Sequence, residues 1–183
     1  MHDERELVKF VRQSNGIEGI YFDEGHLAFD EHLAVLHHII RHANDKNRPL
    51  TESDLLHWHD GLMKWCLGNL AGKYRNRLVM VGEYIAPPFE QIKLFMPKLL
   101  DLCNNAMEER DCWDAHHFFE SIHPFIDGNG RIGRLLLNWC RIRAGFPLHT
   151  VMAVAKFYYY KSIEKWRKEN WKRIEIERAI ILK

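Results

Sequence analysis

Residues 123–134 read H-P-F-I-D-G-N-G-R-I-G-R and combine groups that bind phosphate with one that can take up a proton. Gly128 and Gly130, on either side of Asn129, can adopt the backbone angles that turn successive N–H groups into one concavity, and such a concavity binds anions. The helix expected after this loop adds unpaired N–H groups and the positive end of its dipole. The segment therefore predicts a phosphate-binding loop formed by Gly128, Asn129 and Gly130.

Four side chains of the same segment extend this chemistry. Arg131 and Arg134 lie on one side of the expected helix, where two guanidinium groups can grip consecutive phosphates. Asp127 is a suitable ligand for Mg²⁺, which usually takes one or two carboxylates together with phosphate oxygens. His123 is the only nearby group able to take a hydroxyl proton near neutral pH. Each feature alone is commonly structural, but in this order and spacing they predict a phosphate-handling site.

Most of the chain that must position these residues has helical periodicity. Apolar positions predict helices over residues 3–14, 28–43, 51–67, 89–108, 112–122, 131–144 and 150–181. Thr51 to Asp54 resembles a helix N-terminal cap, and Pro124 is a poor continuation of the helix before it. Residues 72–88 instead contain two short apolar runs around a Gly-Glu turn, followed by Pro-Pro, which indicates a β-hairpin. We expect one mainly α-helical domain over residues 1–183 with a hairpin at 72–88.

The bulk composition argues against several classes of protein. A formal net charge of +1 over 183 residues indicates no general affinity for nucleic acid. The N-terminus lacks the apolar stretch of a signal peptide, and no apolar run reaches the length of a membrane span. We therefore predict a cytoplasmic protein without a membrane segment. None of the four cysteines has C-x-x-C spacing, and we expect reduced, buried thiols at positions 66, 103, 112 and 140.

Two further patterns invite functional readings. The histidine groups at 37–38, 57–59 and 116–117 lack a carboxylate or cysteine at ligand spacing, so we expect core or surface histidines there. The basic tail from Lys161, with Trp166 and Trp171 interleaved, is typical of an amphipathic packing helix. Contact with nucleic acid is the less favoured reading of this tail.

The chain resembles the Fic-domain family. Residues 123–134 match the signature H-x-F-x-[D/E]-G-N-G-R-x-x-R at every fixed position. The flanking stretches A-H-H-F-F-E-S-I-H and L-L-L-N-W-C-R-I-R-A-G-F-P are also similar to a Fic core, and the resemblance covers roughly residues 14–160. It implies a protein adenylyltransferase, which moves AMP from ATP to a Ser, Thr or Tyr hydroxyl of a target protein and releases pyrophosphate.

The resemblance also implies a role for each residue of the signature. His123 would be the base that activates the target hydroxyl, and Asp127 would hold Mg²⁺ between the α- and β-phosphates. The loop 128–130 would form the anion hole around the α-phosphate. Arg131 would bind the β-phosphate, and Arg134 would pair with the γ-phosphate.

A second motif, S-N-G-I-E-G at residues 14–19, fits the family's inhibitory pattern [S/T]-x-x-x-E-[G/N]. The resemblance implies an inhibitory helix within residues 1–20, with Ser14, Glu18 and Gly19 in the motif. Glu18 would pair with Arg134 and force ATP into an unproductive pose. Gly16 should loosen this helix, which suggests incomplete autoinhibition.

The hairpin at 72–88 resembles the flap on which family members dock their targets. Lys73, Tyr74 and Arg75 are candidates to contact a target. Tyr84 and the strand at 79–85 could pair edge to edge with an extended target segment.

Three alternatives remain open at this point. The same fold could remove AMP from a modified protein, with Glu18 orienting water. It could use another phosphate-containing donor, although both arginine clamps favour a triphosphate. A nucleic-acid-binding module is the third reading. The target, automodification and the homo-oligomeric state are left undetermined by the sequence.

Overall fold

Amphipathic stripes at helical spacing fold this chain into helices that share one core. The computed structural model describes residues 3–181, with side chains as far as residue 172. The α-helices of this described range are α1 (Glu4–Ile17), α2 (Leu27–Asn44), α3 (Glu52–Leu67), α4 (Ile92–Asn104), α5 (Glu109–Ile122), α6 (Asn129–Arg143) and α7 (Lys156–Ile181). Single 3₁₀ turns lie at Gly68–Leu70, Phe89–Gln91 and Ala153–Ala155. The predicted fold class, mainly α-helical with a small hairpin, is confirmed.

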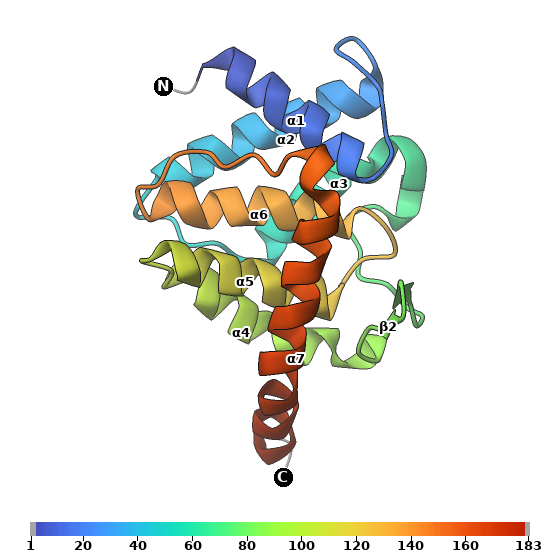
Figure 1. Cartoon of the computed structure of the whole chain (residues 1–183), viewed down its shortest axis with the longest axis vertical. Coiled ribbons are helices and arrows are strands. Elements are labelled where there is room, and N and C mark those ends of the chain that lie inside the picture. The colour runs from blue at the N-terminus through green and yellow to red at the C-terminus, as the bar shows by residue number, and fades with distance from the viewer. Residues whose placement is uncertain (1–2, 182–183) are drawn as a thin grey trace.

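Helix α6 lies at the centre of the molecule and carries the signature arginines. Every residue from Arg131 to Ile142 is buried, as expected for a helix that is surrounded on all sides. α5 packs along α6, while α2 and α3 pack on it together with the end of α1. Figure 1 shows α7 running steeply across the bundle from beside α1, past α5, with its far end projecting beyond the other helices. The position of α6 means that its first turn is held by packing from several directions.

The hairpin is smaller than predicted. β1 (Met80–Val81) and β2 (Tyr84–Ile85) pair antiparallel, with Met80 opposite Ile85. The preceding residues from 72 to 79 form no strand, because this segment bonds instead to the turn after α5. The Arg75 N–H donates to the Pro124 carbonyl at 2.9 Å. The hairpin therefore stands at the edge of the bundle, beside the signature loop (Figure 1).

The first helix is longer than predicted, since it continues through Gly16 to Ile17. Ile17 is fully buried, and the Asn15 Oδ1 lies 2.9 Å from the Nδ1 of His32 in α2. A side chain at Gly16 would begin 3.3 Å from the Cβ of Ala153, so glycine here allows close packing. Tertiary contacts thus override the poor helix propensity of glycine.

Other helix boundaries differ by a few residues from the prediction. The segments predicted at 89–108 and 150–181 each begin with a 3₁₀ turn, so α4 starts at Ile92 and α7 at Lys156. In both cases the chain enters the helix from an extended residue, Pro88 or Met152. Over the residues that the structure describes, no helix is both long and apolar enough to cross a membrane.

The predicted cap at the start of α3 gives a test of local stability. The Thr51 side chain accepts the Asp54 N–H, and the Asp54 carboxylate accepts the Thr51 N–H. We expect Thr51→Ala to lower the free energy of unfolding by about 1 kcal/mol, because the Asp54 N–H at the helix start loses its acceptor, the Thr51 hydroxyl. Ser53→Ala, at an exposed position of the same turn, should change it by less than about 0.5 kcal/mol. Urea unfolding of the two variants measures this, and equal losses would contradict the capping role.

Candidate active site

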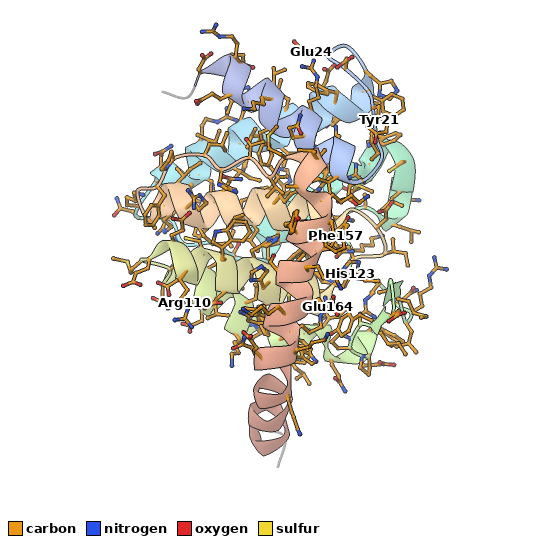
Figure 2. The ribbon with its side chains drawn as sticks, in the orientation of Figure 1. Tyr21, Glu24, Arg110, His123, Phe157 and Glu164 are labelled. Carbon is orange, nitrogen blue, oxygen red and sulfur yellow. The ribbon has the colours of Figure 1, made fainter. Side chains whose placement is uncertain are left out.

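The signature begins where α5 ends, at His123. His123 has left-handed backbone angles, φ 49° and ψ 61°, and it is the only non-glycine residue with positive φ in the described range. Such a conformation is strained and is held here because Pro124 cannot continue the helix. Burial lowers the pKa of the His123 imidazole to about 4, so the ring is neutral at physiological pH and can accept a proton. Figure 2 shows His123 close beside α7 in this view.

Asn129 closes the loop that follows. Its Oδ1 accepts the Phe125 N–H and its Nδ2 donates to the Phe125 carbonyl, both at 2.9 Å. Gly128 precedes the helix with φ 78°, an angle that glycine adopts at little cost. The Asn129 side chain therefore shapes the loop from inside, while the start of α6 presents its backbone N–H groups.

Arg131 and Arg134 are buried in the first two turns of α6, with exposed fractions of 3% and 1%. The Nε and Nη1 of Arg131 and the Nη1 of Arg134 have no hydrogen-bond partner among the described residues. Burial also lowers the pKa of Arg131. A buried guanidinium without partners is costly, and an anion supplies both acceptors and charge. The structure thus brings the two predicted clamps together as incompletely paired donors.

The end of α1 reaches this pair of arginines. The Arg134 Nη2 donates to the Glu18 Oε1 at 2.7 Å and to the Ser14 carbonyl at 2.9 Å. The Arg134 Nε donates to the Ser14 hydroxyl at 2.9 Å. Gly19, with φ +76°, ends α1 in a turn whose N–H groups return to Gly16 and Asn15. Ser14 and Glu18 of the predicted N-terminal motif therefore contact Arg134, and Gly19 ends the helix directly after them.

The Glu18 carboxylate lies in the concavity of the signature loop. A Cβ built on Gly130 would collide with the Glu18 Oε1 and approach the Arg134 Nη1 to 3.1 Å. Glycine at position 130 is thus what lets an anionic oxygen approach the backbone of the first turn. The carboxylate stands where the loop and the arginine would hold a phosphate oxygen.

Asp127 lies at the rim of this concavity with an exposed side chain. Its Oδ1 accepts the Gly128 N–H at 2.6 Å. No group of three or more histidine, cysteine, aspartate or glutamate side chains in the described part of the chain could hold a metal ion. A lone exposed carboxylate beside a phosphate cradle fits Mg²⁺, which keeps water and takes phosphate oxygens as its other ligands.

The structure places the predicted flap residues in different environments. Lys73 is exposed, and Tyr74 is half-buried against the Phe125 ring. The Tyr84 hydroxyl donates to the Ser121 carbonyl at 3.0 Å, and the Arg167 guanidinium lies 3.5 Å from its ring centroid. The hairpin is thus tied to α5 and α7.

Arg75 differs from its prediction. Its guanidinium is 4% exposed and donates to the carbonyls of His123, Arg77 and Pro87. The turn after α5 leaves backbone carbonyls without N–H partners, and an arginine with several donors satisfies them. The Arg75 side chain is therefore a structural brace and is not available to a target.

Two buried residues outside the motifs also belong to the site. Glu120, one turn before His123, has an Oε1 without a partner in the described range, and burial raises its pKa to about 7. The glycine at position 133 leaves room for this carboxylate, since a Cβ there would collide with it. His59 is fully buried and stacks on Phe125. Glu120 lies in the stretch A-H-H-F-F-E-S-I-H and His59 in the histidine group at 57–59, but neither pattern indicated a role at this site.

A cavity adjoins the signature between the hairpin and α7. It has a volume of 790 Å³ and is lined by Tyr84, Glu120, Tyr160 and Arg167, among others. This size is in the range of small-molecule sites. One of its lining residues, Glu120, lies three positions before the predicted base His123 in the chain.

Comparison with known proteins agrees with this geometry. The Fic/DOC family model matches residues 49–140, which is half of the chain and includes the signature. The chain belongs to the Fic/DOC family. Its similarity to a solved Fic domain-containing signaling protein from Bacteroides thetaiotaomicron has a TM-score of 0.77 at 25% identity, covering 88% of this chain and 71% of that one. Fic-1 (residues 134–508) from Caenorhabditis elegans shares the fold, with a TM-score of 0.72 at 22% identity, over 90% of this chain and 56% of that one.

Curated relatives cover the same region. The chain is 35% identical over 128 residues to the protein adenylyltransferase fic-1 of Caenorhabditis briggsae, covering 64% of this chain and 24% of that protein. It is 28% identical over 129 residues to the protein adenylyltransferase Fic of Nematostella vectensis, covering 66% and 29%. The chain thus spans about a quarter of the length of these relatives.

The buried carboxylate of Glu120 predicts a pH effect on stability. Its raised pKa means that the folded state binds the proton more tightly, so its stabilising contribution is full below about pH 4.5 and is lost as pH rises through about 7. We expect Glu120→Gln to gain stability relative to the parent over that window, by on the order of 1–3 kcal/mol. Urea unfolding of both proteins from pH 5 to 8 measures the difference. A difference that stays constant with pH would contradict this assignment.

Proposed function

We propose that this Fic domain is a protein adenylyltransferase that uses ATP and Mg²⁺ and is restrained by its own first helix. The observation that carries this proposal is the pair of buried arginines, whose donors converge on a concavity that the Glu18 carboxylate enters. Buried donors of this kind call for an extended anion, and the phosphate tail of ATP is one. The curated relatives named above as protein adenylyltransferases support the same activity.

The phosphate tail would lie across the first two turns of α6. Gly128 and the first two residues of α6, Asn129 and Gly130, would receive the α-phosphate, because their backbone N–H groups and the helix dipole both favour negative charge. Arg131 would bind the β-phosphate and Arg134 the γ-phosphate. Asp127 would contribute a carboxylate to Mg²⁺, which neutralises charge on the phosphates when it is bound. The nucleoside fits the adjoining cavity, where Tyr84 and Tyr160 offer aromatic surface.

His123 would act as the base. The hydroxyl oxygen of the target attacks the α-phosphorus, and its proton passes to the neutral imidazole. The bond from the α-phosphorus to the bridging oxygen breaks, and pyrophosphate leaves from the arginine clamps. The low pKa of His123 supports this role, because the free imidazole is unprotonated at physiological pH.

The target would dock on the hairpin. Met80, Val81 and Ile85 are exposed there, with Lys73 nearby in the chain. An extended peptide can add to such an edge through main-chain hydrogen bonds. The segment 72–88 would thus serve as the flap, aligned with the base through the contact of Tyr84 with α5.

Residues 1–20 would act as the inhibitory segment. Because Glu18 bonds to Arg134, the γ-phosphate loses its partner and the tail cannot adopt the pose that aligns the α-phosphorus for attack. Ser14 strengthens this contact with two further acceptors. Gly16 lies inside a packed helix. That some AMP transfer remains in the presence of this inhibitory contact stays a prediction.

The central test is incubation with α-labelled ATP and Mg²⁺, followed by mass spectrometry of the labelled protein. We expect the wild-type chain to transfer labelled AMP, and His123→Ala to lower the rate by about 10²- to 10⁴-fold, because the proton acceptor is lost. Incorporation that survives His123→Ala at the wild-type rate would refute the proposed chemistry. Loss of label from an AMP-modified protein in place of gain would indicate the reverse reaction.

The inhibitory contact has its own test. Glu18→Gly should raise labelling by about 10-fold, because Arg134 is released for the γ-phosphate. Glu6→Gly is the matched control. Glu6 is an exposed glutamate in the first turn of the same helix, at the opposite end from Glu18. Labelling that rises equally in both variants would indicate general loosening of α1 and would contradict the proposed inhibition.

A further inference from the structure

We propose that His59 is a positioning residue that holds the Asp127 carboxylate in place for the metal-bound phosphates. This inference rests on the proposed function, in which Asp127 contributes to the Mg²⁺ site. His59 lies on α3, far from the signature in the chain, and its ring is completely buried against the signature loop.

Both ring nitrogens of His59 are engaged with backbone groups. The Nδ1 accepts the Gly72 N–H at 2.9 Å, and the Nε2 lies 3.0 Å from the Asp127 carbonyl oxygen. A backbone N–H can only donate, so the Nδ1 is unprotonated and the proton is on Nε2. The Nε2–H therefore donates to the Asp127 carbonyl, and one neutral tautomer serves both bonds.

The ring also fixes the loop by stacking. Its centroid lies 3.8 Å from that of Phe125, with the two planes 5° apart. Phe125 is in turn joined by its backbone to the Asn129 side chain. The residues on both sides of Ile126 are thus held, by the stack at Phe125 and by the hydrogen bond at Asp127.

Control of the Asp127 backbone sets the direction of its carboxylate. The side chain is exposed and makes a short hydrogen bond to its own neighbour, Gly128. An exposed carboxylate of this kind takes its orientation from the main chain that carries it. A group that fixes a metal ligand in this way tunes the affinity of the site for the metal.

His59 also connects the loop to the base of the hairpin segment. Gly72 begins that segment, and three residues later Arg75 bonds to the carbonyls of Pro124 and His123. One face of the signature loop is therefore braced by α3 and by residues 72–75 together. Among these contacts, the hydrogen bond from His59 is the one made to Asp127, the proposed metal-binding residue.

Two near-isosteric variants separate the two bonds of the ring. His59→Asn keeps an acceptor near the Nδ1 position for Gly72 and loses the donor to Asp127. His59→Gln keeps a donor near the Nε2 position for Asp127. The two variants lose similar ring packing, so a difference between them reports on the bond to Asp127.

The readout is the affinity for ATP by calorimetry, with Mg²⁺ and with EDTA, in the Glu18→Gly background. We expect His59→Asn to weaken Mg²⁺-ATP binding by about 10-fold, as losses of residues behind metal ligands do. Binding with EDTA should change by less than about 2-fold, because the arginine clamps are untouched. His59→Gln should restore most of the Mg²⁺-dependent affinity. Where His59→Asn does not fold, His59→Phe keeps the stack, lacks the donor and should show the same Mg²⁺-specific loss.

Equal losses for both variants, with and without Mg²⁺, would overturn the proposal and leave His59 as a packing residue. Unchanged Mg²⁺-ATP affinity in folded His59→Asn would overturn it as well. The test is independent of AMP transfer, since it measures binding alone. Failure of the Glu18→Gly variant to transfer AMP would refute the proposed function, while a Mg²⁺-specific loss would still support the role of His59.

Discussion

The structure depends on one requirement, which is that two buried guanidinium groups at the start of α6 must find anionic partners. Arg131 and Arg134 are almost completely removed from solvent, yet three of their nitrogen atoms have no partner among the described residues. Burying such donors is unfavourable unless an anion completes their hydrogen bonds. The packing of α2, α3 and α5 around α6 causes this burial. The core of the fold therefore leaves buried donors at the site that need anionic acceptors.

The chain itself supplies acceptors for some of these donors. The end of α1 supplies a carboxylate, a hydroxyl and a carbonyl to Arg134, while the Nε and Nη1 of Arg131 have no partner within the described part of the chain. In the proposed mechanism the same donors bind a phosphate tail, so α1 and ATP compete for Arg134. The competition is built from ordinary helix-end geometry, because Gly19 turns the chain away directly after Glu18. In this proposal, stability and inhibition depend on the same contact.

The signature loop is held by one residue of the signature itself and by two residues from elsewhere in the chain. Asn129 closes it from inside, Arg75 satisfies the carbonyls at the end of α5, and His59 bonds to the backbone of Asp127. Each of these residues uses its side chain on backbone groups. Positions that bind phosphate or metal must be held closely, because electrostatic stabilisation depends on preorganised geometry. The loop thus combines one exposed carboxylate, that of Asp127, with a buried scaffold.

The sequence by itself indicated the helical fold and the hairpin, because periodicity and local spacing carry that information. It also predicted one site over residues 123–134, which lie within the match to the Fic/DOC family. It also indicated that Glu18 and Arg134 would meet, through a resemblance between motifs. The tertiary structure alone decided which residues are exposed and which are packed or bonded in the interior. Arg75 reads as an exposed cation in the sequence but is buried on carbonyls, and Gly16 reads as a helix breaker but packs on Ala153. Glu120 is buried beside Gly133 of α6, and His59 bonds to Asp127 and Gly72 in two loops. These contacts join segments far apart in the chain, so no local pattern records them.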